Sequence, residues 1–176
     1  YSNQEGEEAD ADLDESVFSG SVNYMGDLLE ASLAYETAEE DTGRGERDGF
    51  RGAAAFKITD AIKAVGFYQT VDYTNDTVTD AVRDQLTSDT YGLGAELKVG
   101  SSTAVKGMWM TRDADAEDYD SDMWVVGVEH KLDKAVRVYA NYAFVDNEDN
   151  AALTPWGQAR TATPSGAAGE EASGLS

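Results

Sequence analysis

Apolar and polar residues alternate through most of the chain, in segments of about ten to twelve residues separated by polar loops. In one such segment, residues 135–145, every second position is apolar: Val136, Val138, Ala140, Tyr142 and Phe144. A period of two is typical of a β-strand with one apolar face, because successive side chains of a strand point to opposite sides. The pattern therefore predicts an all-β protein.

The alternation predicts eight strands, at residues 16–25, 28–37, 50–59, 62–73, 90–99, 103–112, 122–132 and 135–145. Short turns follow the odd-numbered strands of this series, and long polar loops are predicted at 1–15, 38–49, 74–88, 113–121 and 146–172. Within the loop 74–88, the stretch TDAVRDQL is expected to form one or two helical turns with Thr79 as N-cap. The chain is thus predicted to be a single domain of antiparallel hairpins.

The lengths of the strands and connections favour a transmembrane up-and-down barrel. A strand of about 9–11 residues crosses a bilayer when tilted, and bacterial outer-membrane barrels have short turns on one side and long loops on the other. Aromatic residues gather near the strand ends of the apolar face, as in the girdles of a lipid-facing band: Phe18, Tyr24, Tyr35, Phe50, Tyr73, Tyr91, Trp124 and Phe144. In the strand 62–73 the outward set is assigned to Val65, Phe67, Val71 and Tyr73.

Composition narrows the function. The chain of 176 residues has a formal net charge of −22, which argues against a nucleic-acid partner because phosphate contacts need clustered Lys and Arg. Cysteine is absent, so disulfides and thiolate metal sites are excluded. An N-terminal signal segment is not visible, since residues 1–15 are acidic.

Two stretches carry a resemblance to the general Gram-negative trimeric porin family: VVGVEHKLDKAVRVYANYAFVDNED (125–149) and SVFSGSVNYMGDLLEASLAYE (16–36). The first resembles a late hairpin of that family, with a short turn containing a basic residue and a Tyr-rich strand. The resemblance implies a barrel of 16 strands, usually trimeric, which passes small hydrophilic solutes passively across the bacterial outer membrane.

The chain departs from the complete family pattern. It has no recognisable constriction-loop segment, no N-terminal strands and no terminal strand ending in an aromatic residue. Residues 1–3 (YSN) are similar to the end of a preceding strand, and residues 173–176 (SGLS) to the start of a following one. We therefore expect a portion of a larger barrel, from its C-terminal half, and consider an independent eight-stranded barrel as the alternative.

The polar faces of the strands hold the main functional candidates. Charges that project into an aqueous pore set its ion preference, and we expect the following residues to line the pore: Arg51, Lys57, Lys106, Arg112, Arg137, Glu30, Glu36, Glu96 and Glu129. The competing interpretation is that these residues form ordinary ion pairs along the wall. Because the long loops are acidic, we expect a mild preference for cations.

Catalysis is poorly supported, and no cofactor is expected. The single histidine, His130, is assigned to the apolar side near a turn, and without a second histidine no Ser-His-Asp arrangement is available. The segment DADAEDYDSD (113–122) has acids at alternate positions, so Asp113, Asp115 and Glu117 are weak metal candidates. It lacks the glycine and the glutamate of an EF-hand loop.

The sequence thus predicts an outer-membrane porin that is not an enzyme, with membrane lipid, two further copies, ions and small hydrophilic solutes as partners. Two alternatives stay open. The first is an outer-membrane binding or adhesion barrel acting through its acidic loops. The second is a soluble β-barrel that holds an apolar ligand inside, with the two faces of the sheet reversed.

Overall fold

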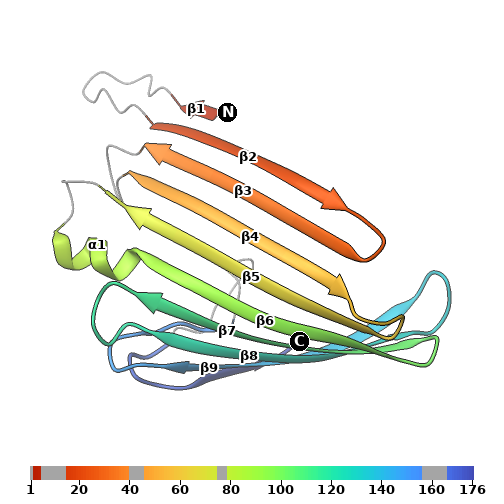
Figure 1. Ribbon diagram of the computed structural model, residues 1–176. Helices are drawn as coiled ribbons and strands as arrows, with labels where there is room; N and C mark the ends of the chain where they lie inside the picture. The colour runs from red at the N-terminus through yellow and green to blue at the C-terminus, as the bar shows by residue number, and fades with distance from the viewer. Residues whose placement is uncertain (1, 5–14, 40–45, 75–78, 156–165) are drawn as a thin grey trace.

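A single antiparallel sheet dominates the computed structural model, which describes residues 2–4, 15–39, 46–74, 79–155 and 166–176 (Figure 1). The strands are β1 (Ser2–Gln4), β2 (Glu15–Met25), β3 (Leu29–Glu39), β4 (Arg47–Lys57), β5 (Ile62–Tyr73), β6 (Ser88–Val99), β7 (Thr103–Ala114), β8 (Ser121–Lys131), β9 (Arg137–Asn147) and β10 (Ala172–Leu175). One helix, α1 (Asp80–Leu86), lies between β5 and β6. Short turns lie at one end of the sheet, and α1 with the longer connections lies at the other.

The strands pair in chain order from β1 to β10, each antiparallel to its neighbour, so the sheet is an up-and-down meander. It curves, with β7 to β9 turning away from the plane of β2 to β6 (Figure 1). In the described part of the chain β1 pairs only with β2, and β10 only with β9, so the sheet is open at both edges. Among these residues, no helix is long and apolar enough to span a membrane.

The register gives the sheet two different faces. On the outer face, apolar positions pair with apolar positions, as in Val22 with Leu33 and Leu93 with Trp109. These side chains are open to the surroundings: Leu33 is 49% exposed and Leu93 is 65% exposed. The opposite face, which we call the polar face, carries the charged and small residues.

A conventional hydrophobic core is missing from the described part of the chain. Only four hydrophobic residues there are buried, namely Ala38, Tyr73, Val145 and Ala151. A soluble sandwich would bury one whole face of each strand against a second layer. Among the described residues, the apolar face has no such layer, so its side chains stay exposed on a single sheet.

The short turns are fixed by side chains that accept backbone hydrogen bonds. Thr59 Oγ1 accepts from the amides of Ala61 and Ile62, and Asp133 Oδ1 accepts from those of Ala135 and Val136 at 2.6 and 2.8 Å. Such local bonds are the reason that Thr and Asp favour turns. Gly100, between β6 and β7, has a φ of +69°, which a residue with a side chain adopts only under strain.

One glycine is required by close packing. A Cβ atom added to Gly94 would lie 2.9 Å from the carbonyl oxygen of Gly107 and 3.3 Å from Cβ of Met108. By contrast, a Cβ at Gly66 would meet no atom within 4 Å. The two glycines therefore differ in what they contribute, although both lie in the middle of strands.

Several strand bounds differ from those in the sequence analysis. The third predicted strand, 50–59, is β4 at Arg47–Lys57, and β9 continues to Asn147 rather than ending at 145. The predicted loop 146–172 is correspondingly shorter and leads into β10. Residues 2–4 of the predicted loop 1–15 form β1, and residues 38–39 and 47–49 of the predicted loop 38–49 belong to β3 and β4. Residues 1, 5–14 and 40–45 of these two loops lie outside the described residues. The strands continue past their apolar segments because, at this end of the sheet, both faces are polar and the hydropathy pattern no longer marks the strand.

One local prediction was wrong, and a second was confirmed only in part. The outward side chains of β5 are Ile62, Ala64, Gly66, Tyr68 and Thr70, whereas Val65, Phe67, Val71 and Tyr73 share the polar face with Arg47 and Arg51. Since both faces of β5 are largely apolar, alternation alone does not fix which face is outside. The helix α1 follows Thr79 as predicted, but the Thr79 side chain makes no capping hydrogen bond.

Candidate functional site

The polar face is rich in basic residues. All nine predicted pore-lining residues lie on the polar face. The strand pairing shows this, since directly paired residues of neighbouring strands point to the same face. Among strand residues whose side chains are described, the face carries four acids, namely Glu30, Glu36, Glu96 and Glu129. It carries nine bases: Arg47, Arg51, Lys57, Lys63, Lys98, Lys106, Arg112, Lys131 and Arg137. The wall is therefore positive, although the whole chain is strongly negative.

Toward the short-turn end, the charges form a network across four strands. Lys106 Nζ lies 3.6 Å from Glu96 and 3.3 Å from Glu129, and Glu129 also pairs with Arg137 at 3.3 Å. Lys63 pairs with Glu30 at 3.5 Å. These groups are partly open to solvent, so the pairs are individually weak and their fields still reach the solution.

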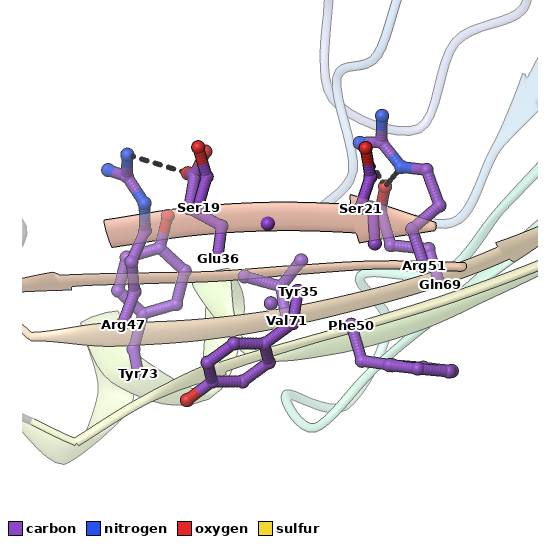
Figure 2. A pocket seen from close by; sticks show the side chains of 13 residues that line it. Ser19, Ser21, Tyr35, Glu36, Arg47, Phe50, Arg51, Gln69, Val71 and Tyr73 are labelled. Atoms are coloured by element: carbon purple, nitrogen blue, oxygen red, sulfur yellow. Dashed lines mark hydrogen bonds and ion pairs between the residues drawn. The ribbon is translucent and has the colours of Figure 1, made fainter. Parts of the chain in front are cut away.

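Further toward the long-loop end, residues of β2 to β5 line an open hollow of about 540 Å³. Arg47 pairs with Glu36 at 3.3 Å, whereas Arg51 is held by a neutral partner. The Nε and Nη2 atoms of Arg51 donate to Oε1 of Gln69 at 2.8 and 2.5 Å. Figure 2 shows both arginines on the same side of the sheet, with Phe50 on the opposite side.

Two of the predicted pore-lining cations have other contacts. Arg112 donates to the carbonyl oxygens of Tyr119 at 3.1 Å and Gln85 at 2.6 Å, so its guanidinium stabilises the connections above the strands. Lys57 lies 2.7 Å from Asp60 in the β4–β5 turn. The hydrogen bond from Lys57, together with its charge, lowers the pKa of Asp60 below the ordinary 3.8.

A buried asparagine joins the connection after β9 to the polar face. Asn147 is 7% exposed, and its Oδ1 accepts from Ser121 Oγ at 2.9 Å and from the Leu153 amide at 3.0 Å. Its Nδ2 donates to the carbonyl oxygens of Leu153 at 3.0 Å and Glu170 at 2.8 Å. This residue was predicted only as part of the polar loop 146–172, and the sequence gives no local signal for its role.

A row of aspartates marks the long-loop end of the outer face, and the sequence analysis missed it as well. The row consists of Asp48, Asp72, Asp89, Asp113, Asp122 and Asp146, one for each strand from β4 to β9. Aromatic side chains nearer the middle of the sheet donate to it: Tyr35 Oη to Asp48 at 2.6 Å, Tyr68 Oη to Asp89 at 2.9 Å, and Trp109 Nε1 to Asp122 at 3.1 Å. In four of these strands an aromatic residue lies two positions from the aspartate, which is visible in the sequence. The strand register then pairs the aspartates directly in three couples, Asp48 with Asp72, Asp89 with Asp113 and Asp122 with Asp146.

The arrangement offers little for chemistry. His130 lies on the outer face and is exposed, with its Nδ1 2.8 Å from Thr103 Oγ1. The candidates Asp113, Asp115 and Glu117 are exposed, and no group of three or more His, Cys, Asp or Glu that could hold a metal ion occurs in the described part of the chain.

The comparison with protein families follows this geometry. The family model described as Gram-negative porin matches residues 1–150. The chain belongs to the Gram-negative porin family. This places the porin in the bacterial outer membrane, confirms the predicted family and fold class, and excludes the soluble barrel. The family and the fold point to a channel and not to an enzyme.

A solved structure supports the same assignment. The anion-selective porin from Comamonas acidovorans is 28% identical to this porin and superimposes with a TM-score of 0.76. The match covers 90% of this chain and 46% of the other, so this chain spans about half the length of its structural neighbour. The search of curated proteins gave no match.

Proposed function

We propose that this chain forms part of the wall of a water-filled channel through which ions and small hydrophilic solutes diffuse passively. The observation that carries the proposal is the division of the sheet into an exposed apolar face and a charged face, with no hydrophobic layer of described residues against either. A transmembrane barrel with lipid outside and water inside needs this division. Its mechanism is size exclusion combined with electrostatic filtering by the wall.

The ionic preference that we now propose is for anions. The mild cation preference expected from the acidic loops has no support from the comparisons, since the similar Comamonas acidovorans porin is described as anion-selective. The excess of basic side chains on the polar face gives a physical reason for anion preference, because lining charges act on an ion at close range. Charges in loops beyond the strands act over longer distances and are screened within about 8–10 Å at physiological salt.

The test is the reversal potential of the full-length protein in a planar bilayer, under a KCl gradient near 0.1 M where screening is moderate. We expect a potential of the sign that indicates chloride preference, and a decrease of that preference when Arg51 and Lys98 are replaced by glutamine. Asp72→Asn, on the outer face, serves as the matched control and should leave the potential unchanged. Cation preference that does not respond to the wall substitutions would refute the electrostatic proposal, and absence of conductance would favour a binding or adhesion barrel.

The predicted partners are also proposals. We propose that further strands pair with the open edges of the sheet to close a barrel of 16 strands, because unpaired strand edges in a bilayer leave backbone groups without partners. We also propose lipid contacts on the exposed apolar face and assembly into a trimer, and membership of the porin family supports both. Chemical cross-linking of the full-length protein in detergent tests the trimer, with a ladder that ends at three copies as the expected result.

A further inference from the structure

The polar face is interrupted by an apolar band, which the sequence analysis did not anticipate. One register row of this face reads Ala53, Phe67, Gly92, Met110, Met123 and Val145 from β4 to β9. The next row toward the short turns, from Ala55 to Ala143, is apolar throughout as well. Basic residues lie on both sides of the band, with Arg51 on the long-loop side and Lys63 and Lys106 on the short-turn side.

At the centre of the apolar band, three apolar side chains lie close together over Gly92. A Cβ atom at Gly92 would lie 2.8 Å from Cε of Met108, 3.0 Å from Cγ of Met110 and 3.4 Å from Cβ of Phe67. The three side chains therefore converge over the bare backbone of Gly92, and all three remain partly exposed. Methionine side chains are flexible and polarizable, which suits them to contact apolar groups of varied shape.

Arg51 lies directly beside this surface. Its guanidinium carbon is 6.0 Å from the centroid of the Phe67 ring, and its Nε and Nη2 atoms are held by Gln69. None of the ion pairs among the described residues includes Arg51, so its charge is not compensated by a nearby carboxylate there. The Nη1 group makes no hydrogen bond to a described residue and is available to a solute oxygen.

We propose that Arg51, Phe67, Met108 and Met110 form a subsite for small carboxylates that carry an aromatic or other apolar body, an inference that rests on the proposed channel function. The carboxylate would accept a hydrogen bond from the guanidinium of Arg51, and the opposite charges of the two groups strengthen this bond. The apolar body would cover Phe67 and the two methionines and remove their exposed area from water. A small carboxylate without such a body makes only the first contact, and an anion with a second charge has to desolvate that charge against the band.

The experiment uses the full-length protein in planar bilayers, with sodium phenylacetate or sodium acetate added to the KCl solution. We expect phenylacetate to reduce the chloride current at a concentration about tenfold lower than acetate does, the factor that follows from removing roughly half of an aromatic ring from water. Phe67→Ala and Met110→Ser are each expected to abolish most of this difference without changing the effect of acetate. Arg51→Gln should weaken the effects of both anions, by roughly tenfold or more.

Phe50→Ala is the matched control, because Phe50 lies on the outer face of the strand that carries Arg51. It should leave both anion effects unchanged. The KCl conductance of each variant reports whether the channel has formed, which separates this inference from the proposed function. Absence of KCl conductance in the unaltered protein would refute the proposed channel function. Normal conductance with equal effects of phenylacetate and acetate would refute the proposed subsite alone.

Discussion

Replacement of Asn147 should release the connection between β9 and β10 from the polar face. The side chain makes four hydrogen bonds at 2.8–3.0 Å, one to Ser121 and three to the backbone of Leu153 and Glu170. Its amide oxygen accepts two of these bonds, and its amide nitrogen donates the other two. Asn147→Ala removes all four bonds, and Asn147→Asp keeps the acceptors but turns an oxygen toward two carbonyl oxygens.

The magnitude follows from the number of bonds and from burial. A hydrogen bond contributes about 1 kcal/mol net, and a buried group left without a partner costs somewhat more. For Asn147→Ala we expect the docking of this connection to weaken by about 3 kcal/mol, which raises its open fraction roughly 100-fold. For Asn147→Asp the loss at neutral pH is at least as large. Because burial and the two facing carbonyl oxygens raise the pKa of the introduced carboxyl, docking is retained in acid and lost as the pH rises through that pKa.

The assay is hydrogen exchange of the backbone amides in detergent micelles. The Leu153 amide, bound to Asn147, and the Gly169 amide, 3.1 Å from the Ala151 carbonyl oxygen, report docking directly. Asn141→Ala is the control, because Asn141 lies on the same face of β9 and is more exposed. The reasoning is refuted if Leu153 exchanges at the same rate in the Asn147→Ala variant as in the Asn141→Ala control.

Three further predictions concern the wall. Leu33→Arg should make the free energy of folding into lipid vesicles less favourable by about 2–4 kcal/mol, because it places a charge on the outer face. Ser32→Arg, the neighbouring position on the polar face, should leave this free energy unchanged. Equal losses in the two variants would mean that the faces are assigned wrongly. Gly94→Ala should lower the temperature at which the folded protein denatures in detergent, because it places a methyl group against the backbone. Gly66→Ala should leave this temperature unchanged, since its methyl group meets no atom within 4 Å. A lower denaturation temperature for Gly66→Ala than for Gly94→Ala would contradict the packing. Because the pKa of Asp60 is lowered below 3.8, its ion pair with Lys57 persists above pH 3.8 and is lost only in stronger acid. A titration of the Asp60 carboxyl by NMR should therefore have its midpoint below pH 3.8. A midpoint above pH 3.8 would show that the pair does not form.

The fold was predictable because the outer face obeys one simple rule. Wherever lipid demands an apolar side chain at every second position, as from Val136 to Phe144, the alternation identifies both the strand and its outward face. The rule fails in β5, where Val65 and Phe67 belong to the apolar band and lie on the polar face. Because of this band both faces of β5 are apolar, so the sequence alone does not show which face points outward. Only the pairing of β5 with its neighbouring strands shows it.

The site was predictable as a set of residues and not as a set of contacts. The charged positions of the polar face could be read from the alternation, but the compensation of each charge depends on register, which brings Lys106 to two glutamates and Arg51 to none. The net sign of the wall was missed for a related reason. Most acids of the chain lie in loops or in the aspartate row, so the overall charge of −22 does not describe the face that solutes would meet.

The aspartate row of the outer face has a consequence for how the sheet is held in the membrane. A displacement toward the periplasm would bring its carboxylates into the hydrocarbon, at about 3 kcal/mol for each charged side chain near the centre of the bilayer, or on the order of 15–20 kcal/mol for the row. The opposite end of the outer face bears Ile58, Ile62 and Val99, and charged residues at that end, such as Asp60 and Asp133, lie in the short turns. The aspartate row therefore limits the depth of the sheet from the long-loop side, through residues that lie on the face opposite the predicted pore.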